Sequence, residues 1–107
     1  MEEKERKRIA ILGSTGSIGT QALDVIDHHR ERFEVEVLTA QNNANLLIQQ
    51  ALKFKPNTVV ISNETLYDQV HAALDPHDIK VFAGVQALDA VVEMDSVDQV
   101  LTALVGY

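Results

Sequence analysis

Apolar residues along the chain follow two periods. Short runs rich in Val, Ile and Leu, of the kind that form buried parallel strands, alternate with longer segments in which apolar residues recur every three or four positions, as on one side of a helix. The short runs predict about five strands, at residues 8–12, 33–39, 58–61, 80–82 and 98–105. In the second of them Val35 and Val37 alternate with glutamates, which predicts one apolar and one polar face.

The segments between the strands predict the helices. The apolar stripe expected on the first helix consists of Ile18, Ala22, Val25 and Ile26. The second helix is expected to begin at Asn43 or Asn45, because asparagine is a favoured N-cap residue. Asn63 is expected to cap the third helix, and Gly84 precedes a short fourth one.

This order of elements predicts the fold class. Strands that alternate with helices form parallel β-α-β units with right-handed crossovers, so we expect one α/β domain over residues 1–107 with a Rossmann-type, doubly wound parallel sheet. After the predicted fifth strand only Gly106 and Tyr107 remain, and no helix of this sequence would cover that strand. Because a parallel strand normally has both faces buried, we expect the sheet to be incomplete and the chain to be a piece of a longer protein.

Three glycines with the spacing G-x-x-G-x-x-G join the first strand to the first helix. Gly13 can adopt a left-handed conformation, Gly16 leaves room where a pyrophosphate would lie, and Gly19 lets the helix approach the strand closely. The donors offered to an anion are the hydroxyls of Ser14, Thr15 and Ser17 and the N–H groups of Ser17 and Ile18. The turn therefore predicts a dinucleotide site, and the alternative is a tight turn that binds nothing.

The second candidate segment follows the second strand and contains Ala40, Gln41, Asn42 and Asn43. NAD-selective sites carry Asp or Glu at this place to bind the ribose 2′-hydroxyl, and none is present here. The absence of a carboxylate permits a 2′-phosphate, to which the three amides can donate hydrogen bonds, although no Lys or Arg adds charge. Asn43 can equally serve only as the helix N-cap.

Composition narrows the function classes. The 107 residues carry a net charge of −7, and four of the nine basic residues lie among the first eight, so an acidic surface remains that disfavours nucleic acid. No apolar run approaches the roughly 20 residues of a membrane helix, and no signal segment opens the chain, so we expect a cytoplasmic protein. Cysteine is absent, the four histidines are expected in solvent, and the acidic residues lack ligand-like spacing, so we predict neither a metal site nor catalytic residues in this chain.

Residues 13–26, Gly-Ser-Thr-Gly-Ser-Ile-Gly-Thr-Gln-Ala-Leu-Asp-Val-Ile, closely resemble the opening of the 1-deoxy-D-xylulose 5-phosphate reductoisomerase family. Two further segments support the resemblance: Leu38-Thr39-Ala40 precedes an asparagine at Asn43, and residues 97–106 look like the family's fifth strand. The resemblance covers nearly all of residues 8–107. It implies the amino-terminal NADPH-binding domain of an enzyme of non-mevalonate isoprenoid biosynthesis.

The resemblance also implies where the cofactor binds. The candidate cofactor-binding residues are Gly13, Thr15, Gly16, Ser17, Ile18, Ala40, Gln41, Asn42 and Asn43. The family often has glycine and a basic residue where this chain has Gln41 and Asn42. Family members are homodimers of much longer chains that isomerise and reduce 1-deoxy-D-xylulose 5-phosphate, a small sugar phosphate, with NADPH and Mg²⁺ or Mn²⁺. Their metal and substrate residues correspond to positions beyond Tyr107, so we expect this chain to be inactive alone.

Two alternatives remain open. The chain could be the cofactor domain of another NADP-dependent reductase such as an aspartate-semialdehyde dehydrogenase, which has a similar glycine turn but lacks the Ser-Ile-Gly and Leu-Asp-Val continuation seen here. It could also be a stand-alone nucleotide-binding module without chemistry, against which the uncovered fifth strand argues.

Overall fold

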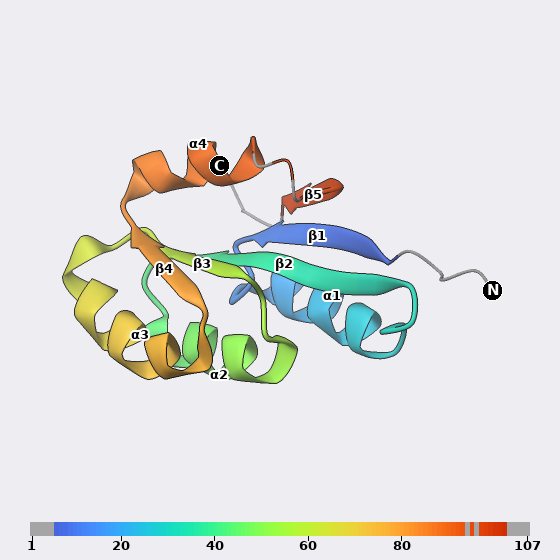
Figure 1. Ribbon diagram of the computed structural model, residues 1–107, viewed down its shortest axis with the longest axis horizontal. Coiled ribbons are helices and arrows are strands. Elements are labelled where there is room, and N and C mark those ends of the chain that lie inside the picture. The colour runs from blue at the N-terminus through green and yellow to red at the C-terminus, as the bar shows by residue number, and fades with distance from the viewer. Residues whose placement is uncertain (1–5, 94, 96, 103–107) are drawn as a thin grey trace.

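A parallel five-stranded sheet forms the centre of the computed structural model, which describes residues 6–93, 95 and 97–102 (Figure 1). The strands are β1 Lys7–Leu12, β2 Phe33–Ala40, β3 Thr58–Ile61, β4 Lys80–Ala83 and β5 Gln99–Thr102, in the spatial order β4-β3-β2-β1-β5. The chain thus steps outward from β1 to β4 and then crosses back to the other side of β1. This confirms the predicted doubly wound α/β fold; residues 103–105 of the predicted fifth strand lie outside the described residues.

The helices cover both faces of the sheet. Figure 1 shows α1, α2 and α3 on one face and α4 on the other, and their bounds are Ser17–Asp27, Ala44–Phe54, Tyr67–Leu74 and Val85–Val92. The 3₁₀ turns η1 (Glu64–Leu66) and η2 (Asp75–His77) flank α3, so the helix predicted after Asn63 begins as a 3₁₀ turn. The larger core lies under α1, α2 and α3, and a smaller one, made of Ala10, Val37, Val60 and Val91, lies under α4. None of the helices in the described ranges is long and apolar enough to cross a membrane.

The strict alternation predicted for β2 is wrong. Ile9 pairs with Val35 but the next residue, Ala10, pairs with Val37, so Glu36 is an extra residue in a β-bulge. Val35 consequently belongs to the core under α1 and Val37 to the core under α4. The bulge therefore supplies apolar side chains to both faces of the strand where alternation would have supplied one.

The apolar stripe predicted for α1 is right for Ala22 and Ile26, which pack in the core, and wrong for Ile18 and Val25. The buried residues of the helix are Gly19, Leu23 and Ile26, whereas Ile18 and Val25 are 55% and 56% exposed. Gly19 determines this rotation, because the position of a Cβ atom there would lie only 2.3 Å from the Gly13 carbonyl oxygen. With Gly19 pressed against the turn, residues one position earlier point about 100° away and face solvent.

The start of α2 distinguishes between the two predicted caps. The side chain of Asn43 accepts a hydrogen bond from the Leu46 N–H at 3.2 Å and is the N-cap. Asn45 instead accepts a hydrogen bond from the Gln69 side chain at 2.9 Å. The helix ends as expected before Pro56, with Lys55 in the left-handed conformation at φ 54°.

Candidate functional site

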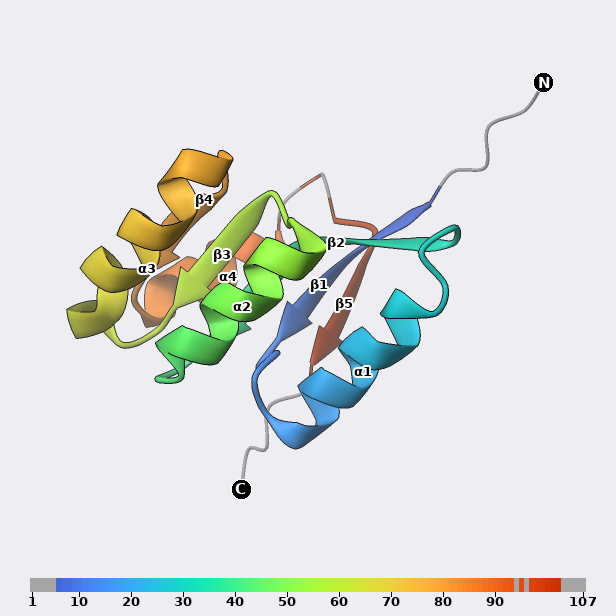
Figure 2. The ribbon, with the colours of Figure 1, turned by 90° about the horizontal axis from the view of Figure 1, so that it is seen from below.

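The carboxyl ends of the parallel strands share one edge of the sheet, which we call the carboxyl edge and define by residues 13–19, 40–43 and 62–64. Figure 2 shows α1 beginning beyond the arrowhead of β1 at this edge. The two segments predicted to contact a cofactor meet here, because Leu12 of β1 pairs with Thr39 of β2. The carbonyl oxygen of Thr39 accepts hydrogen bonds from the N–H groups of Gly13 and Ser14 at 3.1 and 2.8 Å.

The three glycines of the turn differ in conformation and surroundings. Gly13 adopts φ 81°, a left-handed conformation that favours glycine. A Cβ atom at Gly16 would meet the Gly13 carbonyl oxygen at 3.8 Å, an ordinary contact, and would otherwise enter open space. A Cβ atom at Gly19 would lie 2.3 Å from that oxygen and 2.7 Å from the Ser14 Cα. Gly19 thus packs the turn, while Gly16 leaves free space outside it.

The hydroxyl of Ser14 is not a ligand donor, contrary to the prediction. Ser14 is fully buried, and its Oγ donates a hydrogen bond to Oε1 of Gln50 at 2.7 Å. Gln50 Nε2 donates in return to the Ser14 carbonyl oxygen at 2.9 Å. Because both groups are inside the protein, this pair fixes the turn against α2 and leaves Thr15 and Ser17 as the hydroxyls nearer solvent.

The first turn of α1 begins without a side-chain cap. Its N-cap residue is Gly16, which has no side chain, and Ser17 and Ile18 at the start of the helix are exposed. The first N–H groups of a helix have no partner within the helix, and they carry the positive end of its dipole. At α1 these groups lie next to the open space at Gly16, which is the arrangement that binds a pyrophosphate.

The segment after β2 presents amide donors. Asn42 and Asn43 are exposed, and the Oδ1 atom of each accepts a hydrogen bond from within the protein: from Asn63 Nδ2 at 2.9 Å for Asn42 and from the Leu46 N–H for Asn43. Each amide therefore keeps its NH₂ group for a ligand. Gln41 is exposed beside them. Ala40 is 2% exposed, and its carbonyl oxygen accepts a hydrogen bond from the Ser62 N–H, so it has a supporting position beneath the edge.

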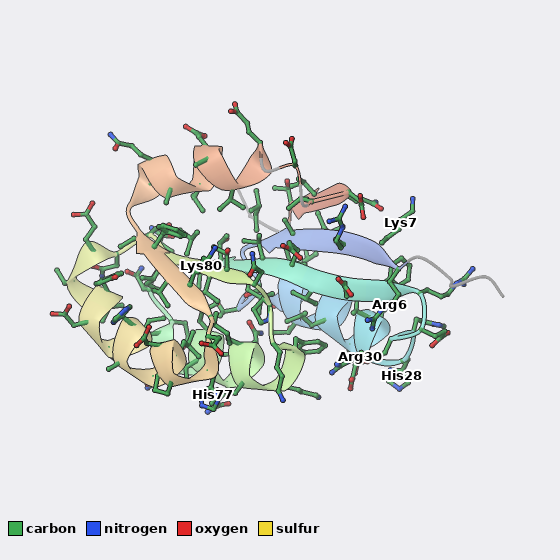
Figure 3. All side chains as sticks on the ribbon, in the orientation of Figure 1. Arg6, Lys7, His28, Arg30, His77 and Lys80 are labelled. Carbon is green, nitrogen blue, oxygen red and sulfur yellow. The ribbon has the colours of Figure 1, made fainter. Side chains whose placement is uncertain are left out.

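The cations of the described residues lie at the opposite end of the strands, which we call the amino edge. They lie at or just before the start of a strand, or at or just after the end of a helix: Arg6, Lys7, Arg8, Arg30, Arg32, Lys53, Lys55 and Lys80. Figure 3 shows Arg6, Lys7 and Arg30 at the end of the sheet where β1 begins. An anion at the carboxyl edge would therefore be held by neutral donors and the helix dipole.

Carboxylates balance the charges at the amino edge. Arg8 forms two side-chain hydrogen bonds of 3.2 Å with Asp98, and these lower the pKa of Asp98. Hydrogen bonds from Arg30 and Lys53 lower the pKa of Asp27 in the same way. A cavity of about 420 Å³ also opens at this edge, but its lining mixes arginine and lysine with carboxylates, and Arg6 is paired with Glu34 at 3.2 Å. This edge therefore offers a polyphosphate no excess positive charge.

Metal ligands do not gather in the part of the chain that the structure describes. There, no group of three or more histidines and carboxylates is placed to hold a metal ion. His28 and His29 lie just after the end of α1, each within 4.0 Å of a carboxylate; His28 is exposed and His29 is half-buried.

Two residues of the site were missed from the sequence. Gln50 lies three positions after the fully buried Leu47, so a polar residue on the buried face of α2 was the available signal. Asn63 was predicted only as a helix cap, and its contact with Asn42 joins residues 21 positions apart. No periodicity could show that second contact, because it depends on β2 and β3 being neighbours.

Comparisons with known proteins agree on one family. The family model described as 1-deoxy-D-xylulose 5-phosphate reductoisomerase matches residues 9–107. The enzyme of that name from Bacteroides fragilis is 57% identical over 107 residues, which is 100% of this chain and 28% of that enzyme. Its counterpart from Bacteroides thetaiotaomicron is 55% identical over 106 residues, 99% of this chain and 27% of that enzyme.

Solved structures of the family have the same fold as this chain. The reductoisomerase from Zymomonas mobilis in complex with NADPH has a TM-score of 0.89 and 31% identity, over 95% of this chain and 27% of that one. A family structure in complex with NADPH, fosmidomycin and magnesium gives a TM-score of 0.87 at 30% identity, over 94% of this chain and 25% of the other. The chain spans about a quarter of the length of these relatives, and it belongs to the 1-deoxy-D-xylulose 5-phosphate reductoisomerase family.

Proposed function

We propose that this chain is the NADPH-binding part of an enzyme that isomerises and reduces 1-deoxy-D-xylulose 5-phosphate to 2-C-methyl-D-erythritol 4-phosphate in the non-mevalonate route to isoprenoids. The observation that carries the proposal is the uncapped first turn of α1 beside the open space at Gly16. The family match and the NADPH complexes of two relatives support it, and they favour it over the aspartate-semialdehyde dehydrogenase and stand-alone alternatives.

In this proposal the pyrophosphate lies over the glycine turn. Gly13 and Gly16 keep side chains away from it, and the N–H groups of Ser17 and Ile18 donate to its oxygens, with the hydroxyl of Thr15 nearby. Gly19 and the Ser14–Gln50 pair hold the turn in this shape. These residues bind and orient the cofactor, and NADPH, when bound, supplies the hydride for the reduction.

The 2′-phosphate lies at the segment after β2. The NH₂ groups of Asn42 and Asn43 donate to it, together with Gln41, and the described part of the chain places no carboxylate within residues 40–43 to repel it. The absence of a basic residue in this segment makes the preference for NADPH over NADH depend on neutral donors, which form weaker hydrogen bonds than cations do.

Other parts of the proposed enzyme complete the reaction. Magnesium is present in three family structures, but the described residues do not fit a metal ion, so we assign no ligand for Mg²⁺ or Mn²⁺ to them. We propose that residues 1–107 form the amino-terminal cofactor domain, that substrate and metal bind to parts of the enzyme outside this sequence, and that the whole enzyme is a cytoplasmic homodimer.

Calorimetric titration of the chain with NADPH and with NADH tests the cofactor assignment. We expect NADPH to bind more tightly, because only NADPH carries the phosphate that the amides recognise. Equal affinities would show that residues 41–43 are not a phosphate site. A separate assay of substrate-dependent NADPH oxidation is expected to give no turnover with the chain alone, and turnover above the blank would contradict the assignment of catalysis to other parts of the enzyme.

A further inference from the structure

We infer that Asn63 is a positioning residue for cofactor selectivity: it orients the Asn42 carboxamide so that an NH₂ group, and not a carbonyl oxygen, faces the 2′-phosphate. The inference rests on the proposed NADPH site and assigns a role to a residue outside it. The two residues follow neighbouring strands, β2 and β3, and their side chains touch at the carboxyl edge.

The orientation of the Asn63 side chain is set by two hydrogen bonds from Thr65. Its Oδ1 atom accepts hydrogen bonds from the Thr65 N–H at 3.0 Å and from the Thr65 hydroxyl at 2.6 Å. An N–H group can only donate, so the oxygen of Asn63 must face Thr65 and its NH₂ group must face the other way. The carboxamide of Asn63 therefore cannot flip without losing its role as the cap of η1.

The orientation of Asn42 follows from that of Asn63. Nδ2 of Asn63 lies 2.9 Å from Oδ1 of Asn42, and a donor facing Asn42 requires an acceptor from it. The backbone holds the two residues together as well, because the Asn63 N–H donates to the Gln41 carbonyl oxygen at 3.0 Å. With its oxygen engaged by Asn63, the Asn42 carboxamide presents its NH₂ group, a donor that a phosphate oxygen can accept.

The orientation of Asn42 by Asn63 matters because residues 40–43 contain no lysine or arginine. Where an arginine binds phosphate, every N–H group of its guanidinium is a donor, so no second residue is needed to orient a donor toward the phosphate. A carboxamide carries a donor and an acceptor at nearly equal distance from its Cγ, and a reversed Asn42 would present its oxygen to the phosphate. Asn63 thus determines the direction of the amide at a site that depends on it.

The substitution Asn63→Asp tests the inference. Aspartate keeps an oxygen for the Thr65 N–H, so the cap and the fold are preserved, but it presents a second acceptor to Asn42 and reverses that carboxamide. We expect the ratio of NADPH to NADH affinity, measured by calorimetry on the full chain, to fall about tenfold, because the reversed Asn42 presents an oxygen instead of an NH₂ group to the charged 2′-phosphate.

Asn45→Asp is the matched control for the added negative charge. Asn45 lies in the first turn of α2, next to this edge, and its oxygen accepts a hydrogen bond from Gln69, so aspartate preserves that bond without contacting Asn42. We expect Asn45→Asp to change the ratio of NADPH to NADH affinity by less than about threefold, because solvent and salt screen an exposed charge. Melting temperatures near that of the wild type verify that both variants are folded.

A double substitution separates action through Asn42 from a direct effect. In an Asn42→Ala background, Asn63→Asp is expected to lower the affinity ratio no more than Asn45→Asp does. Equal effects of Asn63→Asp and Asn45→Asp, or a full effect of Asn63→Asp without Asn42, would overturn the inference while the wild type still prefers NADPH. A wild type without that preference would instead overturn the proposed function on which the inference rests.

Discussion

Two helices begin side by side at the carboxyl edge, and they begin differently. α2 is capped by the side chain of Asn43, whereas α1 follows Gly16 and has no side-chain cap. α4 also begins without a side-chain cap, but there the carboxylate of Glu64 lies beside its N-cap residue Gly84, 2.8 Å from where a Cβ atom would be. Since uncapped N–H groups need an acceptor, the start of α1 is where this edge has most to gain from an external anion.

The two edges of the sheet also differ in charge. The described lysines and arginines lie at the amino edge, where several of them form ion pairs such as Arg8–Asp98 and Arg6–Glu34. At the carboxyl edge the proposed site offers backbone N–H groups and the amides of Asn42 and Asn43, and internal hydrogen bonds fix the direction of these amides. A site made of such oriented donors is expected to lose affinity for an anion when the direction of the donors changes, even if the net charge of the chain stays the same.

The largest expected effect comes from Gly19→Ala. The added Cβ atom would meet backbone atoms of Gly13 and Ser14 at 2.3 and 2.7 Å, so the turn or the helix must move. Overpacking of this kind costs about 3 kcal/mol, of which the better helix propensity of alanine offsets about 1 kcal/mol. We therefore expect urea unfolding to show a loss of about 2 kcal/mol. Stability equal to that of the wild type would mean that the turn is looser than the structure shows.

Gly16→Ala should affect cofactor binding more than folding. Its Cβ atom meets no protein atom closer than 3.8 Å, and φ at this residue is −81°, which alanine adopts readily. The methyl group would instead occupy the space assigned to the pyrophosphate. We expect NADPH affinity to fall about tenfold, equivalent to about 1.4 kcal/mol, with an unfolding free energy within about 1 kcal/mol of the wild type. Unchanged NADPH affinity in calorimetry would place the pyrophosphate elsewhere.

The two helix starts can be compared directly through Asn43→Ala and Ser17→Ala. Asn43→Ala removes the cap of α2 and is expected to cost about 1 kcal/mol of unfolding free energy. Ser17→Ala changes an exposed side chain at the start of an uncapped helix and is expected to cost less than about 0.5 kcal/mol. Urea unfolding of the two variants measures the difference. Equal costs would show that α1 has a cap of its own.

The smallest effect concerns the ion pair at the amino edge. Hydrogen bonds from Arg8 lower the pKa of Asp98 in the folded state, so the carboxylate stabilises the fold above its ordinary pKa and loses that contribution as the pH falls through the lowered value. We expect Asp98→Asn to reduce the melting temperature slightly at neutral pH and to flatten its decline in acid. Thermal melts between pH 2 and pH 7 test this, and NADPH affinity at neutral pH should not change.

The order of strands and helices and the glycine turn could be predicted from the sequence, because each depends on spacing within a short segment. Features that depend on contacts between segments could not. The rotation of α1 is set by Gly19 against the Gly13 carbonyl, and the bulge at Glu36 places Val35 and Val37 on opposite faces. The Ser14 hydroxyl could not be excluded from the site by its sequence, because its hydrogen-bond partner Gln50 lies 36 positions away.

We propose that the cofactor binds at the uncapped start of α1 and at the amides after β2. An NMR titration of the isotope-labelled chain with NADPH tests it directly. We predict that the backbone N–H signals of Ser17 and Ile18 and the side-chain NH₂ signals of Asn42 and Asn43 shift. The backbone N–H signals of Arg8 and Lys55 at the amino edge are expected to stay in place. Shifts confined to the amino edge, with Ser17 and Ile18 unmoved, would contradict it.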